Sequence, residues 1–100
     1  MQGVGSASVS GGRPAFVELP ALLDLAAAQP LRAELLALRG RPLVIEASSV
    51  TRLGGLCLQV LMSARQTWRR DGIAFGLSGT SRAMTDQLNA FGELSLVVDG

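Results

Sequence analysis

Residues 42–71 read PLVIEASSVTRLGGLCLQVLMSARQTWRRD, and this stretch decides the fold. Its opening apolar run, residues 43–45, is short, β-branched and preceded by proline, which predicts a strand buried on both faces. After a turn at residues 48–55 the hydrophobic period changes from a continuous run to helical spacing. This spacing predicts an amphipathic helix over residues 56–71, with Cys57 and Leu61 beside an inward stripe of Leu56, Val60, Ala64 and Trp68. A buried strand, a tight turn and an amphipathic helix make half of a βαβ unit.

The segments on either side supply strands and a helix that such a unit needs. Residues 15–20 read AFVELP and predict a short strand with Phe16 on the core side, and residues 73–77 predict a second central strand. A helix is predicted over residues 82–91, capped by Ser81. Its inward residues are expected to be Met84, Leu88 and Phe91.

The helical segment after Asp24 contains a proline. Leucines at helical spacing predict a helix that stops near Gly40, but Pro30 would remove a backbone hydrogen bond from its interior. We therefore expect the helix to begin near Pro30, with residues 24–29 forming a separate turn.

Length and composition predict one α/β domain. A chain of 100 residues is long enough for one compact core, and 48% hydrophobic residues with only four aromatics suit helices packed against a sheet. We expect a mixed sheet of about four or five strands with three helices. Residues 1–13 are expected to be a flexible arm and residues 14–100 the domain; residues 7–10 are a candidate edge strand, and residues 94–99 a final strand or extended tail.

The charge pattern indicates neither a nucleic-acid binder nor a membrane binder. Nine arginines and eight acidic residues give a formal net charge of +1. The start of the chain does not resemble a signal peptide, and no apolar run approaches the ~20 residues needed to cross a bilayer. We expect a cytoplasmic protein without direct membrane insertion.

The residue inventory argues against catalysis, a metal site or a required cofactor. The chain has no histidine, lysine or tyrosine, so a serine nucleophile would lack an ordinary activating base. Its single cysteine, Cys57, lies in an apolar stripe, which favours core packing over metal binding. Gly54 and Gly55 could present backbone N–H groups to an anion, but Leu56 and Cys57 follow them instead of the P-loop lysine and hydroxyl residue. A sharp turn with close packing is the favoured interpretation of this pair.

Four segments, in matching order, resemble the STAS domains, the fold of anti-sigma factor antagonists and related bacterial signalling modules. The segments are residues 23–38 (LDLAAAQPLRAELLAL), 42–50 (PLVIEASSV), 56–77 (LCLQVLMSARQTWRRDGIAFGL) and 78–94 (SGTSRAMTDQLNAFGEL). The resemblance covers most of the chain, from about residue 16 to residue 94.

The resemblance implies a phosphorylation site that this chain lacks. In that family an aspartate, one or two hydroxyl residues, a glycine and a leucine open the central helix, and a partner serine kinase phosphorylates a hydroxyl there. The matching residues here are Gly54, Gly55, Leu56, Cys57 and Leu58. No acceptor therefore stands at the usual position.

Three hydroxyl residues precede the missing acceptor position. They are possible displaced acceptors, or turn residues that hydrogen-bond the local backbone: Ser48, Ser49 and Thr51. Two other positions follow the family pattern: Glu46 matches the aspartate of the strand, and Gln59 a glutamine seen in many members.

The resemblance implies a non-enzymatic protein-interaction module of bacterial signal transduction. Its partner would be a kinase-like anti-sigma factor or another signalling protein, such as one associated with chemotaxis. The predicted partner-binding residues are Ser48, Ser49, Thr51, Arg52, Gly54, Gly55, Leu56 and Gln59. One alternative is a cytoplasmic STAS subunit of a membrane ABC transport assembly for lipids, bound to its ATPase, and another is a sensor of a flavin or a nucleotide.

Overall fold

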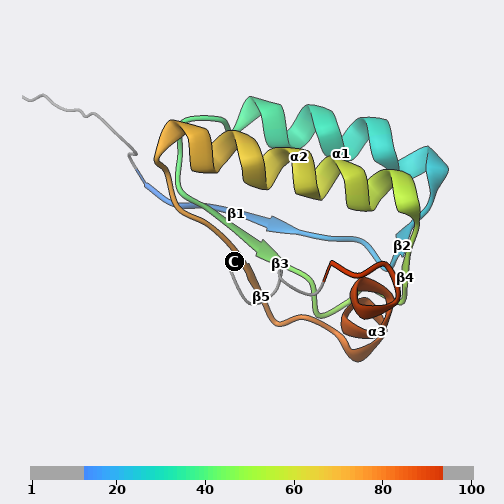
Figure 1. Cartoon of the computed structure of the whole chain (residues 1–100). Coiled ribbons are helices and arrows are strands. Elements are labelled where there is room, and N and C mark those ends of the chain that lie inside the picture. Colours follow the sequence, from blue (N-terminus) through green and yellow to red (C-terminus); the bar gives the residue numbers. More distant parts are fainter. Residues whose placement is uncertain (1–12, 94–100) are drawn as a thin grey trace, which may run out of the picture.

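The computed structural model of the protein describes residues 13–93 (Figure 1). In chain order the elements are β1 (Ala15–Glu18), β2 (Leu22–Leu23), α1 (Leu25–Ala37), β3 (Leu43–Glu46), β4 (Arg52–Leu53), α2 (Gly55–Asp71), β5 (Phe75–Ser78) and α3 (Arg82–Ala90). The α/β class is confirmed. The candidate strands at residues 7–10 and 94–99, and the arm apart from Arg13, lie outside the described residues.

The strands form two parallel sheets. The larger has the order β1-β3-β5, with Ala15 paired with Leu43 and Leu43 with Phe75, and the smaller pairs β2 with β4. Every pairing within residues 13–93 is parallel, so the antiparallel pairing of the expected mixed sheet is not found there. The strand expected at residues 73–77 is β5, which is an edge strand of this three-stranded sheet.

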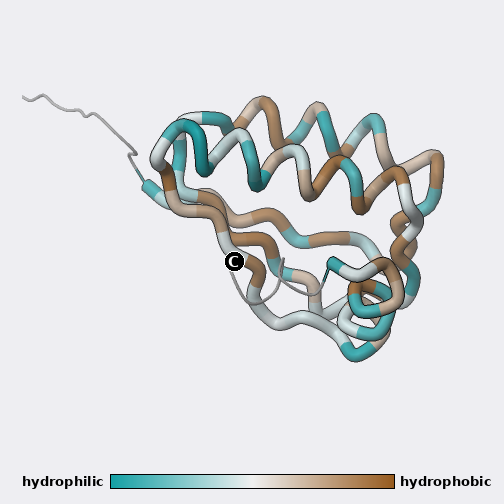
Figure 2. The backbone as a smooth tube through the Cα atoms, viewed as in Figure 1, coloured by the Kyte–Doolittle hydropathy of each residue, from teal (hydrophilic) through white to brown (hydrophobic). Residues whose placement is uncertain are grey.

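Helices α1 and α2 lie side by side over one face of the larger sheet, whereas α3 packs near β4 at one end (Figure 1). The tube in Figure 2 is mainly hydrophobic along β1 and β3, and both helices alternate between hydrophobic and hydrophilic residues. This alternation is typical of helices with one buried side.

Burial in the larger sheet alternates along each strand. In β1, Ala15 and Val17 are buried while Phe16 is 75% exposed, so the prediction that Phe16 faces the core is wrong. In β3, Leu43 and Ile45 are buried but the residues after them are only half-buried, so burial on both faces is wrong too. The reason is that α1 and α2 cover one face only, and strand side chains alternate between faces.

The first helix contains Pro30 in its interior, which corrects the expected start near that residue. The helix starts at Leu25 because the Asp24 carboxylate accepts a hydrogen bond of 3.2 Å from the Ala27 N–H. Burial of Leu31 and Leu35 adds stabilisation on the inward side. These contributions offset the hydrogen bond that proline cannot donate.

The buried stripe of α2 differs from the predicted one. Its buried residues are Cys57, Leu58, Leu61, Ala64 and Trp68. Leu56 is 48% exposed, so its predicted core position is wrong, whereas Val60 is half-buried and packs against the core. Each residue turns a helix by about 100°, so these two side chains lie at the solvent edge of the stripe. As predicted, the helix stops at Gly72, which has a left-handed φ of 70°.

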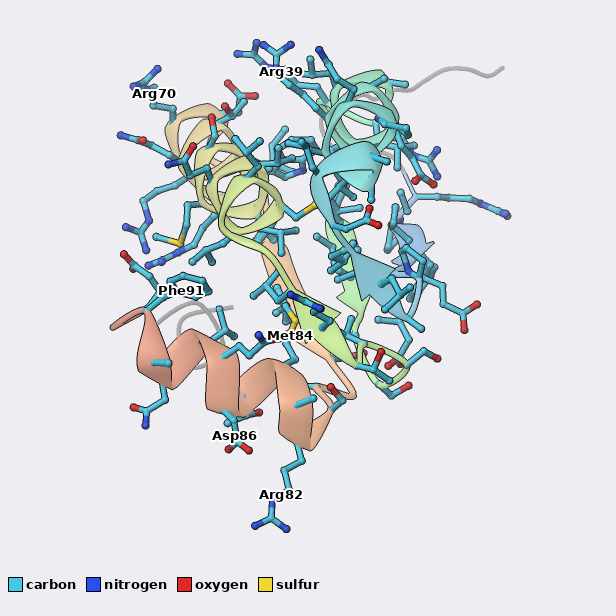
Figure 3. The ribbon with its side chains drawn as sticks, turned by 90° about the vertical axis from the view of Figure 1, so that its right-hand side faces the viewer. Arg39, Arg70, Arg82, Met84, Asp86 and Phe91 are labelled. Atoms are coloured by element: carbon cyan, nitrogen blue, oxygen red, sulfur yellow. The ribbon has the colours of Figure 1, made fainter. Side chains whose placement is uncertain are left out.

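The last described helix, α3, is capped as predicted. The Ser81 hydroxyl accepts a hydrogen bond of 3.0 Å from the Met84 N–H. Met84 and Leu88 are buried, but Phe91 is 47% exposed, which corrects its expected inward position. Figure 3 shows Met84 pointing into the domain while Arg82 and Asp86 point away. None of the helices in residues 13–93 combines the length and apolar character needed to cross a bilayer.

Candidate functional site

The short strands β2 and β4 bring two helix N-termini together. Leu22 pairs with Arg52 and Leu23 with Leu53, both in parallel, and a single residue separates each strand from the helix that follows it. Helices α1 and α2 consequently begin next to each other at one end of the molecule and run in the same direction (Figure 1). Sequence reasoning treated β4 as part of a turn, because a two-residue strand leaves no periodic signal.

The two N-termini differ in charge. Asp24 caps α1 with its carboxylate, whereas Gly54 caps α2 without any side-chain hydrogen bond. The first N–H groups of an α-helix have no acceptor within the helix, and they form the positive end of its dipole. The start of α2 can therefore receive acceptor groups from another molecule.

Close backbone packing favours a glycine at position 54. The Gly54 N–H donates a hydrogen bond of 2.8 Å to the Leu23 carbonyl oxygen, and a Cβ at this position would lie 3.0 Å from that same oxygen. A side chain here, including the aspartate of the family pattern, would push against the backbone of β2. At Gly55 a Cβ would meet no atom within 4 Å. The favoured close-packing interpretation therefore applies to Gly54 alone.

This difference predicts opposite effects of alanine at the two glycines. Gly55→Ala should raise the free energy of unfolding by about 0.5–1 kcal/mol, because alanine restricts the unfolded chain and fits the first helical position. Gly54→Ala should lower it by about 1 kcal/mol, because alanine is a poor N-cap and its methyl group crowds the Leu23 carbonyl. Urea denaturation followed by circular dichroism measures both. Equal changes in the two variants would contradict the close approach of β2.

The polar turn residues make unequal contacts. The Thr51 hydroxyl donates a hydrogen bond of 3.0 Å to the Ala21 carbonyl oxygen, which is the local backbone bonding that the sequence suggested. The Ser48 N–H donates a hydrogen bond of 3.0 Å to the Glu46 carboxylate. Ser49 and Arg52 are exposed, and their side chains make no hydrogen bond or ion pair within residues 13–93. They are therefore free to contact another molecule.

Glu46 organises the first half of the turn. The pKa of its carboxyl group lies below the ordinary value of 4.5, chiefly because Ser48 hydrogen-bonds to the ionised form. The hydroxyl of Ser78 in β5 also donates to this carboxylate, at 3.4 Å. The carboxylate thus links the turn to the neighbouring strand.

The lowered pKa predicts a local response to acid. A carboxyl group whose folded pKa is depressed stabilises the fold above its unfolded pKa and loses that contribution as pH falls through the folded value. The Ser48 amide resonance should therefore titrate below pH 4.5, and Glu46→Gln should abolish that titration. Two-dimensional NMR measures the chemical shift of this amide from about pH 2.5 to about pH 6, which is roughly the range in which carboxyl groups titrate. A Ser48 resonance that titrates unchanged in the variant would contradict the contact.

Helix α3 holds the turn from the opposite side. The Ser81 hydroxyl donates a hydrogen bond of 2.6 Å to the Val50 carbonyl oxygen. The Ser81 N–H donates one of 3.1 Å to the Ala47 carbonyl oxygen. The Gln87 side-chain oxygen accepts a hydrogen bond from the Leu53 N–H. Sequence reasoning identified Ser81 only as a cap and missed Gln87, whose partner is 34 residues away in the chain. No local pattern marks such a contact.

The predicted site residues fall into two groups. Residues 51–56 surround the start of α2, with Gln59 exposed one turn further along the helix. Ser48 and Ser49 instead follow β3, where Ala47 bonds to Ser78 of β5. The structure therefore brings Thr51, Arg52, Gly54, Gly55 and Leu56 together, while the two serines occupy the carboxyl end of the larger sheet.

Neither a metal-ligand cluster nor a reactive thiol is found among the described residues of this region. Within residues 13–93, no three His, Cys, Asp or Glu side chains are grouped so that they could hold a metal ion. Cys57 is buried, its thiol donates a hydrogen bond of 3.3 Å to the Asp24 carbonyl oxygen, and burial raises its pKa. A neutral, buried thiol is a weak nucleophile.

The fold and this surface define a small parallel α/β domain with an exposed, uncapped helix N-terminus beside polar turn residues. A protein-family model described as "Mlab, STAS domain" matches residues 7–97. The chain therefore belongs to the STAS domain family, as its sequence segments indicated. STAS domains are generally non-enzymatic modules that mediate protein–protein interaction. No curated protein matches the chain.

Proposed function

We propose that this STAS domain is a cytoplasmic protein-interaction module of bacterial signal transduction, similar to an anti-sigma factor antagonist. Its partner is a kinase-like anti-sigma factor or another signalling protein. The contact surface consists of Ser48, Ser49, Thr51, Arg52, Gly54, Gly55, Leu56 and Gln59. We call Thr51, Arg52, Gly54, Gly55, Leu56 and Gln59 the α2-start surface, and Ser48 and Ser49 extend the contact to the carboxyl end of the larger sheet.

One observation carries this proposal: a large apolar side chain is exposed at an uncapped helix start. Leu56 is 48% exposed in the first turn of α2, next to N–H groups without a side-chain cap. Arg52, two residues before the cap, has no partner within residues 13–93. An apolar anchor surrounded by polar groups is typical of the centre of a protein–protein interface.

Binding in this proposal is not controlled by phosphorylation at the usual family position. Positions 54 to 56 are glycine, glycine and leucine, so no hydroxyl is present at the start of α2. Among the three displaced candidates, Ser49 is exposed and makes no hydrogen bond within residues 13–93, whereas the Thr51 hydroxyl bonds to the Ala21 carbonyl oxygen and the Ser48 backbone N–H is tied to Glu46. A displaced switch would therefore use Ser49, where added charge would alter the contact surface.

A pull-down with the tagged full-length chain from its native cells tests this proposal. Mass spectrometry on the same sample identifies the partner and maps phosphate on the chain. An ATP-binding serine kinase or another signalling protein, with no phosphate on residues 48–56, is the expected result. Phosphate on Ser49 would mean that the switch has moved, and the absence of any signalling partner would overturn the proposal.

A second candidate is a subunit of a membrane transport assembly that binds the transporter ATPase. The absence of an acceptor at positions 54 to 56 favours it, because a structural subunit needs no phosphorylation switch. Co-purification of a transporter ATPase in the same pull-down, in place of a signalling protein, would decide for this candidate.

A further inference from the structure

A groove lies between α1 and α2 on the side away from the sheet. Its volume is about 420 Å³, and it is lined by ten residues of the two helices. The apolar part includes Leu36, Leu56, Val60 and Ala64, of which Leu36 and Leu56 are each 48% exposed. Figure 3 views the two helices from their N-terminal ends, with Arg39 and Arg70 labelled beyond them. The groove thus has an apolar strip beside polar side chains, and no described residue covers it.

The length of the groove along α2 suits a short helix. The α2 residues that line the groove run from Leu56 to Trp68. From Leu56 to Thr67 the helix rises by about 17 Å, at about 1.5 Å for each of the 11 residues. This length equals about three helical turns. The lining positions on α2 recur every three or four residues, so they form a ridge against which a partner helix can place its own stripe.

The charge of the groove specifies an acidic occupant. Arg32 lines the α1 side, is exposed, and makes no hydrogen bond or ion pair within residues 13–93. No aspartate or glutamate lines the groove. At its far end, Asp71 is already engaged by Arg39 at 3.0 and 3.2 Å. An arginine next to apolar surface pairs well with a carboxylate that is partly shielded from water.

A second copy of this chain is a poor fit for the groove. In a two-fold contact the same patch meets itself, so each groove would face another groove that contains arginine and no acidic residue. Like charges placed opposite each other oppose association.

We propose that the α1–α2 groove binds an amphipathic helix of the partner protein. The apolar stripe of that helix packs on Leu36, Leu56 and Val60, and an acidic residue on its flank pairs with Arg32. This inference rests on the proposed function, because Leu56 and Gln59 belong both to the groove and to the α2-start surface. It adds the chemistry of the partner and extends the contact onto α1.

Site-specific photo-crosslinking in native cells tests this inference. A benzophenone amino acid replaces Leu36 or Ser63 in the groove, Arg52 in the α2-start surface, or Asp86, which points away on α3 (Figure 3). Mass spectrometry then sequences the captured segment. We expect the two groove positions to capture one partner segment with apolar residues every three or four positions and at least one acidic residue, and Asp86 to capture none.

Charge variants of Arg32 sharpen the result. Arg32→Glu should lower the crosslinking yield from Ser63 by about tenfold, whereas Arg32→Lys should retain most of it, because the pair depends on charge. A lipid adduct, a second copy of this chain, a segment without acidic residues, or no effect of Arg32→Glu would overturn the inference.

The outcomes separate the groove from the function on which it rests. Crosslinks from position 52 without crosslinks from positions 36 or 63 would contradict the proposal that the groove binds the partner. They would still support the α2-start surface. Crosslinks from none of these three positions would overturn both proposals.

Discussion

Replacing Trp68 with alanine is expected to lower the free energy of unfolding by about 3–5 kcal/mol. Trp68 is 1% exposed near the end of α2, and its ring centroid lies 6.0 Å from that of Phe75 in β5. Its indole N–H donates a hydrogen bond of 2.6 Å to the Arg41 carbonyl oxygen. The substitution removes a large buried side chain and leaves that carbonyl without its donor. The sequence placed Trp68 in the inward stripe of the helix, and its burial confirms this.

The size of this effect is large for a domain of 100 residues, whose total stability is of the order of 5–15 kcal/mol. Urea denaturation followed by far-ultraviolet circular dichroism measures it, because the variant has no tryptophan left for fluorescence. Trp68→Phe keeps an aromatic ring but loses the hydrogen bond, so a smaller loss of about 1–2 kcal/mol is expected.

Leu25→Ala is the matched control for this measurement. Leu25 is 73% exposed, so its truncation should change stability by less than about 0.5 kcal/mol. A loss under about 1 kcal/mol for Trp68→Ala would show that α2 is not fixed to the sheet by this residue.

Replacing Leu56 with aspartate is expected to weaken binding of the partner by about 100-fold or more while leaving the domain folded. Burying a carboxylate where an apolar side chain made contact costs several kcal/mol unless the partner supplies a counter-charge. The fold should tolerate the change because Leu56 is half exposed, and a negative charge in the first turn of a helix is favourable. Isothermal titration calorimetry with the partner identified by pull-down measures the affinity.

Phe16→Asp provides the control for surface specificity. Phe16 is also a large exposed hydrophobic residue, but its side chain lies on the sheet face opposite α1 and α2. We expect this variant to bind with unchanged affinity. Unchanged binding by Leu56→Asp, together with an unchanged melting temperature, would mean that the partner binds elsewhere.

The strand, turn and long helix of residues 42–71 were predictable because their signals are local. An apolar run, a change of hydrophobic period and a glycine after the helix each depend on neighbours within a few residues. The Ser81 cap was predictable for the same reason. The family was predictable because four such segments occur in a fixed order, and the family match over residues 7–97 confirms it.

The sequence also predicts a partner-binding surface at residues 48–59, but it did not determine how these residues are arranged. Leu56 was assigned to the core because residues 56, 60, 64 and 68 share a helical stripe. The actual stripe keeps Ala64 and Trp68 but has Cys57, Leu58 and Leu61 buried in its first half in place of Leu56 and Val60, since the neighbouring helix and the sheet both contact α2. Rotation about the helix axis depends on what the helix packs against, and a single period does not encode it.

The sequence by itself determined the α/β class, the family, the boundaries of α2 and α3 to within a residue, and the lack of a hydroxyl at positions 54 to 56. Only the tertiary structure decided that β2 and β4 set two helix starts side by side, that the Leu23 carbonyl crowds any side chain at Gly54, and that Gln87 holds the turn. The physical reason is distance along the chain. These contacts join residues about 30 positions apart, through hydrogen bonds of backbone N–H groups and through close packing of one backbone segment on another. Contacts of these two kinds leave no periodic pattern in the sequence.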